Sequence, residues 1–140
     1  MKRLAFKTIV IFMVFSPCIE AASKDQVVNK LQTMSAFYIK ILATENIDYR
    51  CKFLNENDHN ILKVMKTTID KEITNYGWPS LEKPEYKPGS IGYVEIDNEA
   101  HRLAKDVSTK HLCDKNSEKY TNEISTMSAK LLKMWGVPIY

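Results

Sequence analysis

Residues 76–93 read Tyr-Gly-Trp-Pro-Ser-Leu-Glu-Lys-Pro-Glu-Tyr-Lys-Pro-Gly-Ser-Ile-Gly-Tyr and separate two parts of the chain that have helical periodicity. The stretch holds three of the four glycines and three of the five prolines in the 140-residue sequence. Proline removes a backbone donor and fixes φ, whereas glycine leaves the backbone free, so this composition cannot continue a helix. We therefore expect a long Gly/Pro-rich loop, preceded by a helix that ends at Gly77 with Pro79 two residues later.

Two amphipathic helices are expected before the loop. The first begins at Ser23, where Ser23-Lys24-Asp25-Gln26 has the form of a capping box, and its pattern fades near Glu45 and Asn46. A connection over residues 47–56 follows, and Asn57 or Asp58 caps the second helix. Core positions recur at intervals of three and four residues. They are Val27, Leu31, Met34, Tyr38 and Ile41 in the first helix, and Ile61, Leu62, Met65, Ile69, Ile73 and Tyr76 in the second.

Two further helices are expected after the loop. Residues 93–96 suit a short extended piece, after which Asp97 or Asn98 caps a helix that runs to Cys113. Residues 114–117 break the chain and cap the last helix, which Gly136 and Pro138 end. The core positions are Ala100, Leu103, Ala104, Val107 and His111 or Leu112 in the third helix, then Tyr120, Ile124, Met127, Leu131, Leu132 and Trp135 in the fourth. The sequence thus predicts an all-α fold of about four helices, arranged as two hairpins joined by the loop.

The N-terminus has the order of a secretory signal peptide. Lys2 and Arg3 precede an apolar run over residues 8–15, and small residues follow at Ala21 and Ala22. We expect cleavage after Ala21, with lipidation at Cys18 as the alternative. The apolar run is shorter than the roughly 20 residues that span a bilayer, so no transmembrane segment is expected. We predict a periplasmic or extracellular protein whose residues 22–140 form a single helical domain.

The charge balance of residues 22–140 excludes some partners. Of the 20 Lys and Arg residues, three lie in residues 1–21, and of the 17 Asp and Glu residues, one does, which leaves a net charge of +1. This balance gives no case for a nucleic-acid partner or an anionic membrane surface. The two cysteines of this part, Cys51 and Cys113, are expected to form a disulfide, with free thiols or intermolecular pairing as the alternative.

The three histidines do not complete a site in the sequence. Asp97 and His101 have the spacing of two ligands on one helix face, but no third ligand or metal motif accompanies them, so we expect no metal. His111 lies at the end of the predicted third helix, where it suits the C-terminal dipole. The third histidine is His59.

Motifs for nucleophilic or phosphate chemistry are missing as well. The chain has no Gly-x-Ser-x-Gly elbow and no phosphate-binding glycine loop. Arg50 and Arg102 are the only arginines after residue 21, which argues against a site that clamps phosphates with several guanidinium groups. We predict no catalytic residue and no cofactor.

The aromatic residues of the loop are the predicted binding residues. Trp78, Tyr86 and Tyr93 belong to the side-chain types most enriched in binding hot spots, and long loops are often functional. The alternative for Trp78 is a lid on the helical core. Our leading hypothesis is an exported protein-binding module of the inhibitor, immunity or regulatory type.

Two other functions remain open from the sequence. One is a small secreted hydrolase that uses His111 with Asp114 or Glu99. The other is a carrier whose methionines line a cavity for an apolar ligand. Those methionines are Met34, Met65, Met127 and Met134.

The run from Asp58 to Pro79, with its Gly77-Trp78-Pro79 turn, resembles an uncharacterised bacterial family. Members of that family share a helix, a Gly-Trp-Pro turn and a later Gln-His-Ala-Asp segment. Here the later segment reads Lys-His-Leu-Cys-Asp over residues 110–114, so the glutamine is missing and one residue is inserted. The resemblance implies no activity and draws attention to Trp78, His111 and Asp114.

Overall fold

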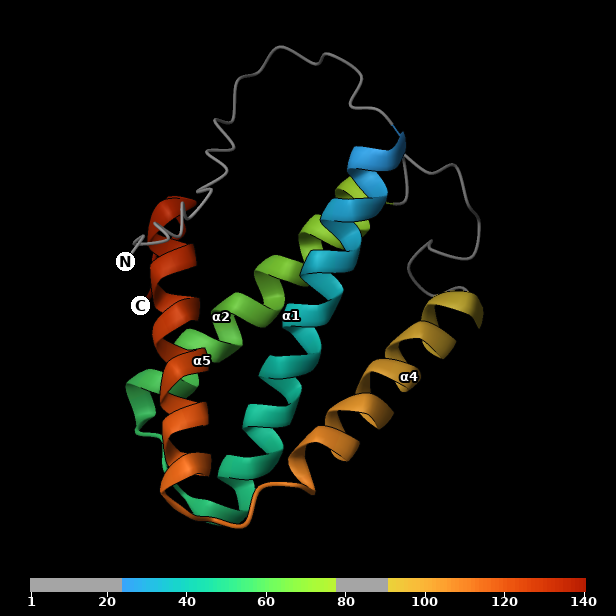
Figure 1. Ribbon diagram of the computed structural model, residues 1–140. Helices are drawn as coiled ribbons and strands as arrows, with labels where there is room; N and C mark the ends of the chain where they lie inside the picture. Colours follow the sequence, from blue (N-terminus) through green and yellow to red (C-terminus); the bar gives the residue numbers. More distant parts are fainter. Residues whose placement is uncertain (1–23, 78–90) are drawn as a thin grey trace, which may run out of the picture.

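The computed structural model describes residues 24–77 and 91–140 and is all-helical over these ranges (Figure 1). Four α-helices and one π-helical turn follow one another along the chain. They are α1 (Lys24–Cys51), α2 (Glu56–Glu72), the π-helix η1 (Ile73–Gly77), α4 (Ile91–Ser108) and α5 (Lys115–Met134). The predicted all-α fold with one disulfide is confirmed.

Several predictions fall on other parts of the chain. The signal peptide over residues 1–21, the cap at Ser23 and the loop residues Trp78 and Tyr86 lie outside the described residues. The predicted end of the second helix agrees with the structure, because the helical backbone continues through η1 to Gly77.

Helix α1 is the central element of the bundle. In Figure 1 it lies between α4 on one side and α2 with α5 on the other. The main core lies among α1, α2 and α5, and its buried residues are Ile41, Ile61, Leu62, Met65, Ile69, Ile124 and Leu132. A separate minor cluster lies between α1 and α4, and its buried residues are Leu42, Ala43 and Ala104.

The predicted end of the first helix is wrong, because α1 continues to Cys51. Ile47 is fully buried, and the positions that face the other helices beside it include the polar residues Thr44 and Asp48. Polar residues at core positions remove the apolar periodicity on which the prediction depended. The connection to α2 is therefore short, and α2 begins at Glu56 rather than after Asn57 or Asp58.

The cap of α2 is Asn55. The Asn55 side chain accepts a hydrogen bond from the Asp58 backbone N–H at 3.0 Å, and the Asp58 side chain accepts one from the Asn55 N–H at 3.3 Å. This reciprocal pair is a capping box, which satisfies two backbone donors that the first turn leaves free. Asp58 was predicted as a cap and instead completes the box at the third helical position.

Both predicted ends of the third helix also differ from the structure. Residues 93–96 are helical rather than extended, and Asp97 lies inside α4 instead of capping it. An extended piece needs a neighbouring strand for its backbone hydrogen bonds, whereas a helix satisfies them internally. At the other end, α4 stops at Ser108, so His111 lies in the connection to α5 rather than in a last helical turn.

Helix α5 begins and ends as predicted, with Asp114 as N-cap and Gly136 in the left-handed region at φ 67°. Its buried face was predicted only in part, because Met127 is 46% exposed. Small hydroxyl residues occupy much of that face, and they are Ser117, Thr121, Ser125 and Ser128. Three of the hydroxyls donate to groups nearby in the chain, as where Ser128 donates to the Ile124 carbonyl at 2.8 Å, and Ser125 donates to the Asp58 carboxylate of α2 at 2.7 Å. All four can therefore be buried without an unpaired donor.

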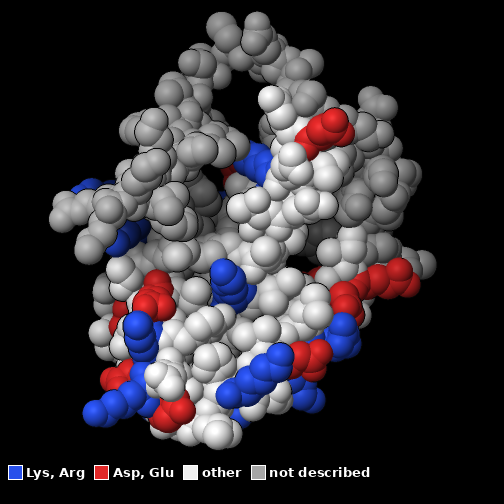
Figure 2. Space-filling view, in the orientation of Figure 1, with Lys and Arg blue, Asp and Glu red and all other residues white. Residues whose placement is uncertain are grey.

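Charged side chains are mixed over the surface. On the described part of the face in Figure 2, Lys and Arg alternate with Asp and Glu, and neither sign covers a large area. Ion pairs between helices contribute to this pattern, such as Lys66 of α2 with Glu45 of α1 at 2.9 Å. The mixed surface agrees with the near-neutral balance of residues 22–140.

Candidate functional site

The ends of α1 and α4 and the starts of α2 and α5 meet at one end of the bundle, which we call the disulfide end (residues 47–59 and 108–120; Figure 1). Cys51 and Cys113 are bonded there, with their Cα atoms 5.2 Å apart, so the predicted disulfide is confirmed. Arg50 Nη2 donates to the Ser108 carbonyl at 2.6 Å and lies 3.4 Å from the His111 carbonyl. The bridge and this arginine fix the α4–α5 connection against the end of α1.

Two residues at the bridge have backbone dihedral angles that residues other than glycine rarely adopt. Lys52 has φ 57° and Cys113 has φ 56°, both in the left-handed region that costs a residue with a Cβ roughly 1–2 kcal/mol. Lys52 follows the last residue of α1, and its N–H donates to the Asp48 carbonyl at 2.8 Å. Glycine is the usual residue at such a position. The side chain of Lys52 has a contact of its own, because its ammonium lies 5.0 Å from the centre of the Tyr49 ring, within range of a cation–π contact.

A buried carboxylate and a histidine form a pair at this end that no sequence pattern indicated. Asp48 is 2% exposed, and its carboxylate accepts a hydrogen bond from the Leu54 N–H at 2.7 Å. The other carboxylate oxygen lies 3.1 Å from His59 Nε2. Asp48 therefore ties the connection and α2 to the end of α1. The His59 side chain is half exposed, so the pair joins a buried carboxylate to the surface of α2.

His111 and Asp114, the pair considered for a hydrolase, are linked through Ser117. The Ser117 hydroxyl donates to Asp114 at 2.9 Å, and His111 Nδ1 lies 3.2 Å from the same hydroxyl oxygen. Because that hydroxyl has only one proton, the histidine nitrogen is the donor to Ser117. Ser117 is 1% exposed, and its N–H also donates to Asp114 at 2.8 Å. This is the arrangement of a helix cap rather than of a base that activates an accessible nucleophile.

The environment shifts two pKa values near His111. The hydrogen bonds from the backbone N–H and then the hydroxyl of Ser117 hold the pKa of Asp114 below its ordinary value. Burial raises the pKa of Tyr120, whose ring centre lies 4.7 Å from that of His111. Both shifts follow from the capping and packing at the start of α5.

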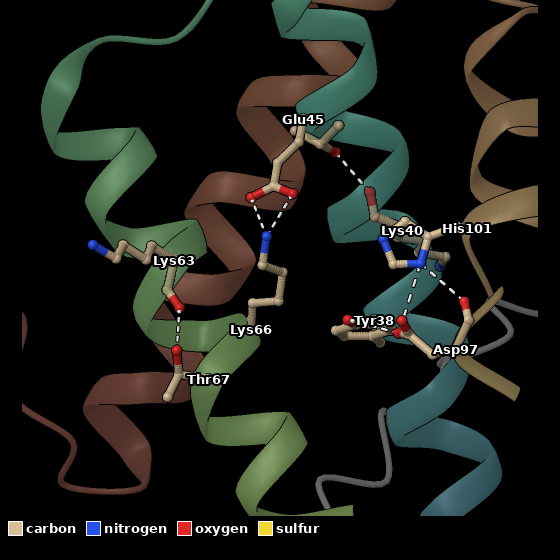
Figure 3. A network of polar contacts seen from close by, with 9 residues as sticks. Tyr38, Lys40, Glu45, Lys63, Lys66, Thr67, Asp97 and His101 are labelled. Atoms are coloured by element: carbon tan, nitrogen blue, oxygen red, sulfur yellow. Dashed lines mark hydrogen bonds and ion pairs between the residues drawn. The ribbon is translucent and has the colours of Figure 1, made fainter. Parts of the chain in front are cut away.

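The Asp97–His101 pair lies on α4, away from any third ligand among the described residues. His101 Nδ1 is 3.6 Å from an Asp97 carboxylate oxygen, and Tyr38 of α1 donates to the same carboxylate at 3.4 Å (Figure 3). Glu99, the other acid considered for a hydrolase, is held by Arg102 at 2.6 Å. That hydrogen bond lowers the pKa of Glu99.

The four methionines of the carrier hypothesis do not line one internal cavity. Met65 is fully buried in the main core, and Met34 packs against it. Met127 and Met134 instead lie 46% and 65% exposed on α5.

Two large side chains at the disulfide end are largely exposed to solvent. Tyr49, two residues before Cys51, is 79% exposed, and Leu112, next to Cys113, is 80% exposed. Sequence periodicity did not single them out, because Tyr49 was placed in a connection and Leu112 at a core position. Of the predicted binding residues, Trp78, Tyr86 and the side chain of Tyr93 lie outside the described residues, although the Tyr93 backbone belongs to α4.

None of the helices in residues 24–77 and 91–140 combines the length and apolar character needed to cross a bilayer. Comparison with family models, with curated proteins and with solved structures finds no match to this chain. The resemblance to the family with the Gly-Trp-Pro turn therefore stays a prediction.

Proposed function

We propose that the protein is an exported helical module that binds another protein, of the inhibitor, immunity or regulatory type. The observation that carries the proposal is the exposure of Tyr49 and Leu112, at 79% and 80%, beside the two bonded cysteines. Aromatic side chains held in a fixed position are efficient anchors, because they lose little conformational freedom when a partner covers them.

The polar residues of the same end support this proposal over catalysis. Asp48, Asp114 and Ser117 each receive or donate hydrogen bonds that fix a helix end. Arg50 donates hydrogen bonds to the carbonyl groups of Ser108, at the end of α4, and of His111, in the connection to α5. The polar groups at this end thus hold the scaffold, while Tyr49 and Leu112 are left on the surface.

Export is part of the proposal. The Cys51–Cys113 bridge fits a protein of an oxidising compartment, where disulfides persist, and the signal-peptide pattern of residues 1–21 points to the same destination. The loop residues Trp78, Tyr86 and Tyr93 stay part of the proposed binding surface on sequence grounds.

The test is quantitative binding to a partner captured from the source organism and then purified. The double variant Tyr49→Ser/Leu112→Ser should weaken binding by at least about 30-fold, the loss expected of a hot spot. The matched control Met134→Ser/Tyr140→Ser removes two side chains that are 65% and 95% exposed, and it should change affinity by less than about threefold.

A third variant separates the two proposed surfaces. If only Trp78→Ala/Tyr86→Ala weakens binding, the protein binds through the loop and the assignment to the disulfide end is wrong. If no saturable protein partner is captured, the proposed function itself is wrong.

A further inference from the structure

Helix α4 is attached to the bundle differently from the other three helices. The main core draws its buried residues from α1, α2 and α5, and no described residue of α4 belongs to it. The apolar contact of α4 is the minor cluster, in which Leu42 is the single large buried residue and Ala43 and Ala104 are small. The backbone of α4 lies close along α1, but the contact is made largely by small side chains. Hydrophobic stabilisation scales with the apolar area removed from water, so α4 gains less from the burial of large side chains than α2 or α5 does.

The polar contacts of α4 with α1 are concentrated at its C-terminal end. There, the Arg50 guanidinium donates to the Ser108 carbonyl at 2.6 Å and lies near the His111 carbonyl. Nearer the N-terminal end, the polar contacts of the described side chains include the long Tyr38–Asp97 hydrogen bond at 3.4 Å (Figure 3). A charged donor on a carbonyl group is much the stronger of the two, so Arg50 is the principal clamp.

Ala100 and Val107 of α4 are partly buried against the minor cluster, whereas other described side chains of α4 add little attachment. Arg102 pairs with Glu99 and Asp106, both on α4 itself. Val94 and Ile96 are about half exposed, at 51% and 46%. In the view of Figure 1, α4 and α1 lie closest at the disulfide end and diverge toward the N-terminal end of α4, in agreement with this exposure.

We infer that α4 is a strap that opens from α1 as a separate unit, ahead of unfolding of the three-helix core, and that Arg50 sets how often it opens. Stability is not uniform within a fold, and elements with few buried apolar contacts open at lower free energy than the core does. Opening uncovers an apolar strip on α1 that includes Ile39, Leu42 and Ala43. A change that weakens the contacts of Arg50 therefore exposes this strip to solvent more often. The inference does not depend on the proposed binding function.

Native-state hydrogen exchange of the disulfide-bonded protein at increasing urea concentrations tests the strap. Amides of residues 98–107 should exchange through an opening with little urea dependence, because opening one helix exposes little surface. Amides in the middle of α2 and α5 should exchange only through an opening with the full urea dependence of global unfolding. The inference is overturned if the amides of α4 follow the same urea dependence as those of α2 and α5.

A pair of arginine variants tests the clamp. Arg50→Ala should speed exchange in α4 by about 10- to 100-fold, the loss expected for a hydrogen bond from a charged donor. Arg102→Ala removes the other arginine of residues 22–140, and it should change exchange in α4 by less than about threefold because exposed ion pairs contribute little. The same data give the exchange rates of α2 and α5. If Arg50→Ala speeds amide exchange equally in α2, α4 and α5, the proposed role of Arg50 is wrong.

Discussion

Removing the buried carboxylate of Asp48 should be among the most damaging single changes at the disulfide end. Asp48→Ala deletes the acceptor of the Leu54 N–H, a bond of 2.7 Å to a charged group, at a cost of roughly 1.5–3 kcal/mol. The pair with His59 adds less than about 1 kcal/mol, because 53% of the His59 side chain is exposed to water. The expected loss of unfolding free energy is therefore about 3 kcal/mol.

Urea denaturation followed by far-ultraviolet circular dichroism at pH 7 measures this loss. With a slope of roughly 1–3 kcal/mol per molar urea, the Asp48→Ala midpoint should fall by about 1–3 M. Asp48→Asn keeps an oxygen that can accept from Leu54, and it should cost only about 1 kcal/mol. Asp106→Ala, which removes an exposed acid of α4, is the control and should leave the midpoint nearly unchanged. If Asp48→Asn is as damaging as Asp48→Ala, the argument from the Leu54 hydrogen bond is wrong.

Three further changes test other parts of the disulfide end. Replacing both Cys51 and Cys113 by alanine should lower the unfolding free energy by about 4 kcal/mol in urea denaturation, since the bridge closes a sequence separation of 62 residues; a loss below about 1 kcal/mol would contradict this. Lys52→Gly should raise the melting temperature by relieving the left-handed backbone at φ 57°, a gain of about 1 kcal/mol, whereas Lys52→Ala should give none. The pKa of Asp114 is lowered in the folded state, so its contribution to stability is present above about pH 4 and is lost as the pH falls below that. Thermal melts of the wild type between pH 5 and pH 2 should therefore fall more steeply than those of Asp114→Asn, and parallel slopes would show that the cap is not coupled to the charge.

The fold was predictable where apolar residues alone mark the buried face. Ile61, Leu62, Met65 and Ile69 are buried as the periodicity of the second helix predicts, and the stop at Gly77 follows from glycine and proline. The prediction failed where buried positions are polar. Asp48 on α1 lies at such a position, so the helix looked shorter than it is.

The candidate site was harder to predict, because its contacts join residues far apart in the sequence. The Cys51–Cys113 bridge was predictable from cysteine number and expected export. The contact of Arg50 with the Ser108 carbonyl was not, because backbone carbonyl groups leave no signature in the sequence. The exposure of Tyr49 was not predictable, because the apolar periodicity placed the end of the first helix before this residue, whereas α1 continues to Cys51.

The most direct test of the central claim, that the disulfide end contacts a partner protein, is site-specific photo-crosslinking in the source organism. A benzophenone amino acid placed at Tyr49 or at Leu112 should give one discrete crosslinked product that contains a second polypeptide. The same probe at Met134, which is 65% exposed on α5, is the control and should not give that product. Failure to crosslink from both Tyr49 and Leu112, or equal crosslinking from all three positions, would contradict the account.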